Sequence, residues 1–183
     1  MANYNVTITN GTGSQAMKAG TYNVSATSAH GYDITTLSPT TYTATDSTGT
    51  GTFTLSANGT LTLVFNETGA SGGTPITTGS VVMTDSTGNT QYGNSITINS
   101  TGEAVFNNVP FGDSETPFKL YFKQLTTDDN HNIYESVIVV DMTSQTQTQY
   151  VQNTEIALQT ITLTDSNYSG LPIGNATLSF NQD

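Results

Sequence analysis

The residues of this sequence that could do chemistry are few, and most of them lie in one acidic, amide-rich stretch. Residues 126–132 read Thr-Thr-Asp-Asp-Asn-His-Asn between two predicted strands. The side-chain oxygens of Asp128, Asp129, Asn130 and Asn132 are the kind of ligand that Ca²⁺ takes, about six to eight at a time. Their spacing differs from that of an EF-hand loop, and Asp and Asn are also ordinary turn formers. A calcium site with these four ligands and a simple turn are therefore both open.

The sequence contains few of the residue types that catalysis uses. His30 and His131 are the two histidines, they are far apart in the sequence, and neither lies in a recognisable nucleophile motif. Cys is absent, which excludes thiolate metal sites, a thiol nucleophile and a disulfide framework. We therefore predict that the chain is not an enzyme and that it takes no cofactor apart from the calcium considered above.

The charge of the chain excludes two classes of partner. Lys and Arg together number 3 and Asp and Glu number 14, for a formal net charge of −11. So few positive charges cannot neutralise a phosphate backbone or attract an anionic membrane surface, so we expect no nucleic acid as partner. No apolar run approaches the roughly 18 residues of a membrane-spanning helix. The partners that remain are neighbouring modules of the same chain or like subunits, with a host glycan or host protein as the alternative.

Alternation of apolar and polar residues predicts strands throughout the chain and no helix. Tyr (9) and Phe (7) are common, and together with the many Thr residues they suit a pleated, half-buried surface. Asn58-Gly59, between two alternating runs, predicts a hairpin over 52–66. A run of β-branched residues at 136–140 predicts a strand buried on both faces. Other strands are predicted at 4–9, 21–26, 80–84, 103–108, 118–123, 161–165 and 175–180.

These strands predict the fold class and the domain organisation. The fold class is all-β, with tandem Ig-like or prealbumin-like β-sandwich domains. A small, polar, Gly-rich stretch lies between two alternating runs, and its part at 70–75 is interpreted as an interdomain linker. The first module would then span 1–69 and the second 76–183.

The C-terminal stretch at 161–180 weakly repeats a part of the sequence that lies before it. Met83-Thr84-Asp85-Ser86 is echoed by Leu163-Thr164-Asp165-Ser166, and Gly93-Asn94-Ser95 by Gly174-Asn175-Ala176, about 80 residues apart. Either this stretch resembles the first strands of a further module, or Thr-rich strand–turn–strand segments simply look alike. Its predicted strands carry apolar faces that have to be buried, and we expect them to complete the second sandwich.

Several short motifs carry a resemblance to a known family. The Asp-Ser-Thr-Gly-Asn turn at 85–89 and the run Thr-Gly-Glu-Ala-Val-Phe-Asn-Asn-Val-Pro-Phe-Gly at 101–112 resemble the Cna-B or SpaA-type, prealbumin-like repeat of Gram-positive surface adhesins and pili. The motifs at 19–24 (Ala-Gly-Thr-Tyr-Asn-Val) and 31–33 (Gly-Tyr-Asp) are similar to the family's Gly-x-Tyr-x-Val strand and later Gly-Tyr, and the run at 59–69 resembles the closing strand and linker of Gram-positive surface repeats. The resemblance implies a β-sandwich stalk module that is extracellular, at the cell surface or in the cell wall.

The resemblance also implies a covalent cross-link from which this sequence departs. Many members of the family join a Lys on the first strand to an Asn or Asp on the last strand, with a buried acid assisting. The three lysines of this chain, Lys18, Lys119 and Lys123, lie outside the predicted first strands. We therefore predict no Lys isopeptide bond, while a Thr–Gln ester bond stays open.

The sequence thus predicts a structural stalk or adhesin module of a secreted, surface-displayed bacterial protein. One alternative is a sandwich that binds a glycan or host protein through the tyrosines near turns, namely Tyr32, Tyr42, Tyr92, Tyr134 and Tyr168. Another is a subunit of an extracellular filament that exchanges strands with its neighbours. The order of strands in each sheet separates these possibilities, because it shows whether the end strands close within the chain.

Overall fold

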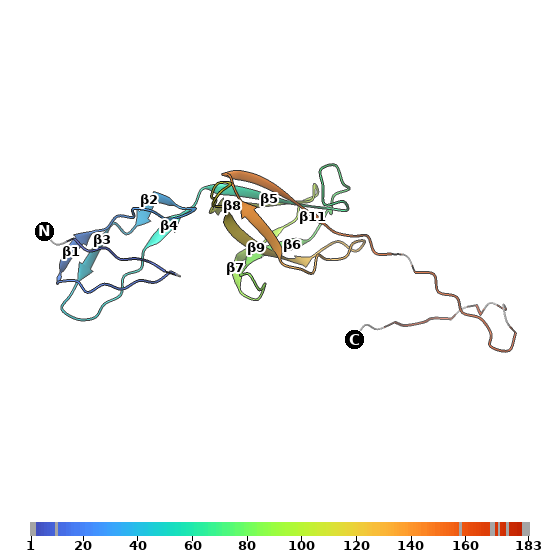
Figure 1. The fold of residues 1–183 in the computed structure, drawn as a ribbon. Helices are drawn as coiled ribbons and strands as arrows, with labels where there is room; N and C mark the ends of the chain where they lie inside the picture. The colour runs from blue at the N-terminus through green and yellow to red at the C-terminus, as the bar shows by residue number, and fades with distance from the viewer. Residues whose placement is uncertain are drawn as a thin grey trace.

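The computed structural model describes residues 3–180, apart from positions 10, 158, 169–170, 172 and 175. These residues form eleven strands and no helix, which confirms the all-β prediction. Accordingly, no helix in the described ranges could cross a membrane. Figure 1 shows three parts in a row, namely an N-terminal segment with β1 to β4, a central sandwich with β5 to β11, and a C-terminal tail.

The central sandwich consists of two sheets. One has the strand order β10-β9-β6-β7 and the other β11-β5-β8. Every neighbouring pair is antiparallel except β5 and β11, which run parallel. The strands of the first sheet are β6 (Ser80–Thr84), β7 (Gln91–Thr97), β9 (Phe118–Thr126) and β10 (Ile138–Met142). Those of the second are β5 (Gly59–Asn66), β8 (Glu103–Val109) and β11 (Thr146–Gln152).

The core lies between these two sheets. On β5 the alternation places Leu61, Leu63 and Phe65 fully inside the sandwich. The sheets meet where the rings of Phe106 on β8 and Phe122 on β9 lie 4.7 Å apart. Because each buried side chain of this size contributes roughly 1.5–3 kcal/mol, this core is the main source of stability.

The expected hairpin over 52–66 is wrong, and so is the module boundary at residue 69. Strand β4 (Thr54–Ser56) pairs with β2 in the N-terminal segment, while β5 pairs with β8 and β11. The sandwich therefore begins near residue 57, and the predicted linker at 70–75 belongs to the loop between β5 and β6. The side chain of Asn66 holds this loop, because its Oδ1 accepts from the N–H of Gly69 (2.7 Å) and its Nδ2 donates to the carbonyl of Ala70 (2.7 Å).

Strand β10 is not buried on both faces. It forms the edge of its sheet, with Ile138 and Val140 buried and Val139 exposed between them. A strand whose sheet is covered on one side needs a single apolar face. The outward Val139 therefore reflects the β-propensity of valine and not burial.

The N-terminal segment is built from two small ladders. Strand β1 (Gly20–Asn23) pairs with β3 (Thr41–Ala44), and β2 (Asp33–Ser38) pairs with β4. No described side chain between residues 3 and 56 is buried. The predicted strand at 4–9 is not formed, and its end instead makes a tight turn in which the backbone of Thr9 pairs with that of Thr12. The segment therefore lacks the closed core that a second sandwich would have.

The C-terminal tail leaves the sandwich after Ile156 and extends away from it (Figure 1). The expectation that this stretch completes the second sandwich is wrong, since seven strands close the two sheets without it. The large apolar side chains described in the tail are exposed, and Phe180 reaches 73%. The described residues of 161–165 and 176–180 form no extended ladder with the sandwich.

Candidate functional site

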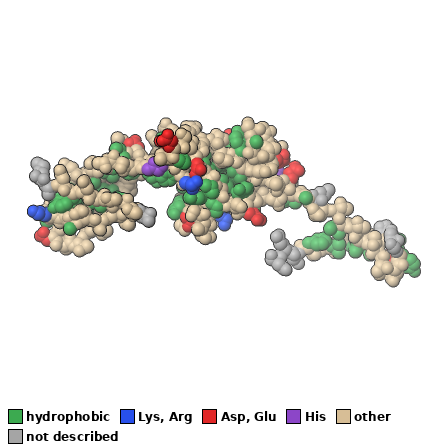
Figure 2. All heavy atoms as spheres, in the orientation of Figure 1, with side chains coloured by type: hydrophobic (Ala, Val, Ile, Leu, Met, Phe, Trp, Pro, Cys, Tyr) green, Lys and Arg blue, Asp and Glu red, His purple; other side chains and the backbone are tan. Residues whose placement is uncertain are grey.

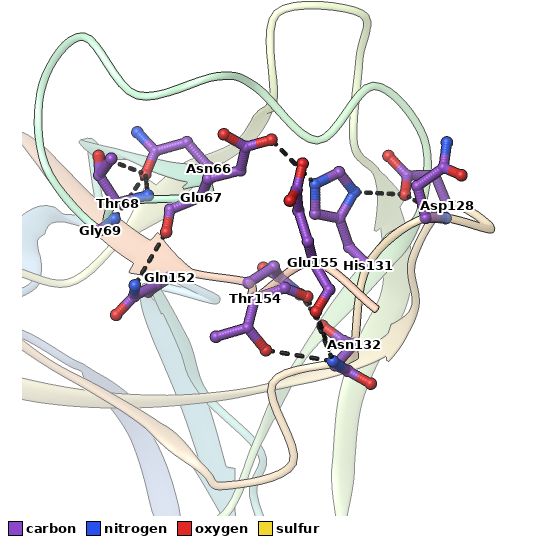
Figure 3. A network of polar contacts seen from close by, with 12 residues as sticks. Asn66, Glu67, Thr68, Gly69, Asp128, His131, Asn132, Gln152, Thr154 and Glu155 are labelled. Carbon is purple, nitrogen blue, oxygen red and sulfur yellow. Dashed lines mark hydrogen bonds and ion pairs between the residues drawn. The ribbon is translucent and has the colours of Figure 1, made fainter. Parts of the chain in front are cut away.

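The ionisable side chains gather most closely where the chain leaves the sandwich. Glu67 follows β5, Asp128 and His131 lie in the loop between β9 and β10, and Glu155 follows β11 (Figure 3). Because β5 and β11 run parallel, their ends reach the same pole of the sandwich, where the β9–β10 loop meets them. We call Glu67, Asp128, His131 and Glu155 the exit cluster.

His131 is held between two carboxylates. Its ring is 9% exposed, its Nδ1 lies 2.6 Å from Asp128 Oδ1, and its Nε2 lies 3.3 Å from Glu67 Oε1. Asp128 Oδ1 also accepts from the backbone N–H of Asn130 at 3.1 Å, which fixes the loop that carries the histidine. Both ring nitrogens are thus engaged by acids, so neither is placed to activate a hydroxyl nucleophile.

The surroundings favour the charged forms of these groups. Burial opposes the charge on His131, but its hydrogen bonds with Asp128 and Glu67 outweigh burial and raise the pKa of the imidazole above its ordinary value. Burial likewise raises the pKa of Asp128, yet the hydrogen bond from His131 prevails and the net pKa is lowered. Hydrogen bonds from Thr74 and then from His131 lower the pKa of Glu67. These shifts favour an imidazolium flanked by two carboxylates.

The exit cluster also has the composition of a metal centre. One ligand atom each of Glu67, His131 and Glu155 lies within 4.8 Å of the others. Asp128 bonds to Nδ1 of His131, so that Nε2 faces the two glutamates. In many metal sites a carboxylate outside the ligand set orients a histidine ligand in the same way. Imidazole with carboxylates suits zinc better than calcium. A metal would have to displace the proton that Nε2 shares with Glu67.

The four residues that the sequence suggested for calcium do not converge on one point. Asp128 turns to His131, while the Asn132 side-chain amide donates to the carbonyls of Thr154 (3.3 Å) and Glu155 (3.2 Å). Asp129 and Asn130 are exposed. Calcium binding by this loop stays a prediction, and calorimetric titration of the chain with Ca²⁺ would test it.

Backbone hydrogen bonds hold residues 153–156, which we call the exit segment, at the pole of the sandwich where the exit cluster lies, which we call the exit pole. Asn153 N donates to Asn66 O at 2.9 Å, and Ile156 N donates to Asn130 O at 2.9 Å. Asn132 N donates to the carbonyl of Thr154 at 2.8 Å. The segment that follows β11 is consequently fastened both to the end of β5 and to the β9–β10 loop.

A buried amide network lies beneath the cluster. Gln124 Oε1 accepts from Asn153 Nδ2 (2.8 Å) and from the backbone N–H of Tyr134 (2.9 Å). Asn153 Nδ2 also donates to the carbonyl of Asn132 at 2.8 Å. Gln124 and Asn153 are each 1% exposed, so the bond between their side chains forms away from water and is costly to break. Sequence reasoning missed this network because Gln124 and Asn153 look like ordinary strand and loop residues.

The tyrosines considered for glycan or protein binding, and the lysines considered for a cross-link, do not gather at one site. Of the five tyrosines, two lie in the N-terminal segment, two in the sandwich and one in the tail, so they form no shared platform. Lys119 on β9 makes an ion pair with Asp141 on β10 at 2.6 Å, with both side chains half exposed. Strand β5, which is the first strand of the sandwich, carries no Lys.

No family model and no curated protein matches the chain. Among solved structures, it is similar to the minor pilin GBS52 of Streptococcus agalactiae, with 14% identity, a TM-score of 0.46, and coverage of 57% of this chain and 47% of that one. The pilus 2b backbone protein of group B streptococcus gives 12% identity, a TM-score of 0.42, and coverage of 63% and 47%. The major pilin BcpA of Bacillus cereus gives 12% identity, a TM-score of 0.39, and coverage of 56% and 32%.

The chain spans less than half the length of each of these three structures. All three are pilus proteins of Gram-positive bacteria, the class that the sequence motifs resemble. At TM-scores below 0.5 this likeness carries no argument, and the function proposed below rests on the geometry of the chain itself.

Proposed function

We propose that this chain is a load-bearing structural module of an extracellular surface stalk. The observation that carries the proposal is the parallel pairing of β5 and β11, which are the first and last strands of the sandwich. Because the two strands run the same way, the chain enters the sandwich at one pole and leaves it at the opposite one. A module of this kind extends a stalk along its own axis, as the row of parts in Figure 1 indicates.

Tension on such a chain acts along the β5–β11 ladder. Seven residue pairs form it, from Thr60 opposite Thr146 to Asn66 opposite Gln152. Pulling the two ends slides the strands past each other, so the hydrogen bonds share the load at the same time. A ladder pulled open from one end instead breaks one bond after another, which needs less force.

The exit cluster supports the same role. It joins the end of β5, the β9–β10 loop and the segment after β11 at the point where tension leaves the module. Side-chain bonds add to the backbone ties, since Gln152 Nε2 donates to the carbonyl of Glu67 at 2.8 Å. Fastening the end of β11 in this way opposes fraying of the ladder that carries the load.

The composition is compatible with a place outside the cell. A net charge of −11 keeps copies apart in solution, and the absence of Cys removes any dependence on redox conditions. We place the module at the bacterial surface or cell wall, with no enzymatic role, in line with a cluster whose histidine is occupied by two carboxylates.

Single-molecule pulling tests the proposal, and the absence of Cys allows handles at chosen sites. Handles at Asn58→Cys and Thr154→Cys load the β5–β11 ladder in shear. Moving only the second handle to Gln145→Cys opens the same ladder from one end, which makes a matched control. We expect the shear geometry to require several-fold more force. Equal forces in the two geometries would overturn the load-bearing role.

A further inference from the structure

The tail contains a turn that resembles the turn of the β6–β7 hairpin. In that hairpin Asp85 N donates to Thr90 O (2.9 Å), and Asp85 Oδ1 accepts from the N–H of Thr87 (3.0 Å). In the tail Asp165 N donates to Leu171 O (3.1 Å), and Asp165 Oδ1 accepts from the N–H of Asn167 (2.8 Å). The repeat seen in the sequence therefore extends to an aspartate-anchored turn, whose loop is one residue longer in the tail.

The two hairpins differ in what covers them. The sandwich covers the apolar side chains of the first hairpin, where Val81 is 0% and Ile98 1% exposed beside it. In the tail, Ile161 is 58% and Leu178 48% exposed. Apolar side chains lie open to view on the tail in Figure 2. The residues that line its shallow apolar hollow are Ile161, Leu163, Ile173, Ala176, Leu178 and Phe180.

Among its described residues, the tail also has an edge that pairs with no other strand. Ile173 N donates to Leu163 O at 3.3 Å, so the backbone groups of Leu163 and Asp165 point into the hairpin. In an extended strand the groups of the intervening residues, Thr162 and Thr164, then point outward. Their counterparts in the sandwich are Val82 and Thr84, which pair with Lys123 and Tyr121 of β9.

The N-terminal segment presents an edge that matches. Strand β1 has β3 as its neighbour on one side, just as β9 has β10, and both pairs are antiparallel. Val24 N donates to Thr40 O at 2.8 Å, so the alternation places the backbone groups of Thr21 and Asn23 on the other, open side of β1. In the sandwich, the side of β9 away from β10 is occupied by β6.

An aromatic face adjoins this edge. Tyr22 of β1 lies opposite Tyr42 of β3, and the ring of Tyr4 packs edge-on to Tyr22 at 5.6 Å. Phe53 packs edge-on to Tyr42 at 6.1 Å. These rings are incompletely covered, so an added strand with an apolar face would bury them further.

We propose that the tail of one copy adds to β1 of a second copy, so that copies join head to tail. Thr162 would lie opposite Asn23, Leu163 opposite Tyr22 and Thr164 opposite Thr21. This register reproduces the pairing of Met83 with Phe122 between β6 and β9. The inference rests on the proposed structural role and deepens it, because it names the contact by which modules of separate chains are joined.

Two further observations favour a second copy as the occupant. The sandwich separates the tail from the N-terminal segment of its own chain, so one chain does not reach its own edge (Figure 1). The two ends also carry little charge, since Lys18, Asp33 and Asp46 lie in 3–56 and Asp165 lies in 159–180. The contact between tail and β1 therefore involves the two weakly charged ends and not the acidic sandwich. Repulsion between the negative charges of the two copies opposes this contact only weakly.

Sedimentation of the full chain tests this inference. We expect the mass to rise with concentration above the monomer value of 19.3 kDa. Asn23→Pro removes an outward N–H from β1, and Thr162→Pro removes one from the tail, so each variant alone is expected to stay monomeric. The matched controls Asn23→Ala and Thr162→Ala keep the N–H and are expected to associate. Leu163→Lys offers a second way to block the tail without proline.

Mixing gives the decisive result. Asn23→Pro keeps a working tail and Thr162→Pro keeps a working edge, so an equimolar mixture is expected to form a dimer of twice the monomer mass and no larger species. A chain that stays monomeric at every concentration overturns the inference. Association lost with Thr162→Pro but retained with Asn23→Pro also overturns it, because it would indicate tail-to-tail pairing. The pulling experiment concerns a single sandwich, so its outcome is independent of association.

Discussion

The N-terminal segment and the central sandwich have similar sequence patterns and different interiors. Both alternate apolar and Thr-rich positions, and both form antiparallel ladders. Yet Leu61, Leu63 and Phe65 are fully buried in the sandwich, while Tyr22 and Tyr42 of the N-terminal segment remain half-buried. Alternation thus predicts a strand with one apolar face. It does not predict that a second sheet is present to cover that face.

The difference lies in how many strands each region contributes. Two-stranded ladders are marginal in water because they offer too little area to cover. The sandwich places four strands against three, and its buried apolar side chains pack together in one core cluster. The proposed addition of a tail to β1 would give the N-terminal segment a third and a fourth strand on its β1–β3 ladder.

Truncating one aromatic residue in each region gives the largest contrast. Phe122→Ala removes a fully buried ring from the sandwich and is expected to lower the free energy of unfolding by about 3–5 kcal/mol. Tyr22→Ala is expected to change the main unfolding transition by less than about 0.5 kcal/mol, because the residue lies outside the core. Urea denaturation of the monomeric chain measures both. Similar losses from the two variants would mean that the regions share one core.

The exit pole offers the next largest effect. Asn153→Ala removes the buried hydrogen bond to Gln124 Oε1 and the partly buried one to Asn132 O, and is expected to cost about 1–3 kcal/mol. Thr148→Ala, at an exposed position of β11, serves as the control and is expected to cost less than about 0.5 kcal/mol. Thermal unfolding separates the two. An equal loss of stability at both positions would mean that the amide network contributes no more to stability than any other position near β11.

Local pattern was enough to locate most strands, because alternation at 61–65, 80–84 and 118–122 depends only on neighbouring residues. The partners of those strands were not predictable in the same way. Asn58-Gly59 correctly indicates a break between strands, but β5 pairs with β11, whose residues lie more than 80 positions later. The parallel pairing, and the boundary that depends on it, required the long-range contacts of the folded chain.

The exit cluster shows the same limit. The stretch at 126–132 drew attention through its own composition, and Asp128 does belong to the site. Glu67 and Glu155 come from segments with no local signal, since each is a single acid beside a strand end. His131 looked isolated in the sequence because its partner Glu67 is separated from it by 64 positions.

The contact between the two regions can be tested separately. Gly31 has a φ of +81°, and a methyl group there would lie 2.6 Å from Phe118 Cδ2, at the place where His30 and Tyr32 pack on that ring. Gly31→Ala is expected to cost about 1–2 kcal/mol locally and to speed hydrogen exchange in β2 and β4. Gly72→Ala shares the positive φ (+86°) but meets open space, so it isolates the effect of the clash. Unchanged exchange in Gly31→Ala would show that the segment is not held by Phe118.

The smallest expected effect comes from pH, through His131. The pKa of this imidazole is raised on folding above its ordinary 6.5, so its contribution is complete below that pH and is lost as the pH rises through the folded pKa. The pKa values of Glu67 and Asp128 are lowered from 4.5 and 3.8, so their contribution is lost as the pH falls through the folded values. The cluster should therefore stabilise the exit pole most between those two limits.

His131→Gln measures this contribution directly, since it keeps a polar side chain and removes the charge. We expect the variant to be less stable than the parent by about 1 kcal/mol near pH 5.5, and the difference to shrink as the pH rises toward 8. Denaturant titrations at a series of pH values, with Thr148→Ala on β11 as the non-titrating control, give the curve. A difference that grows with pH would show that His131 is neutral in the folded chain. The sandwich would then owe its closed exit to the amide network and the backbone alone.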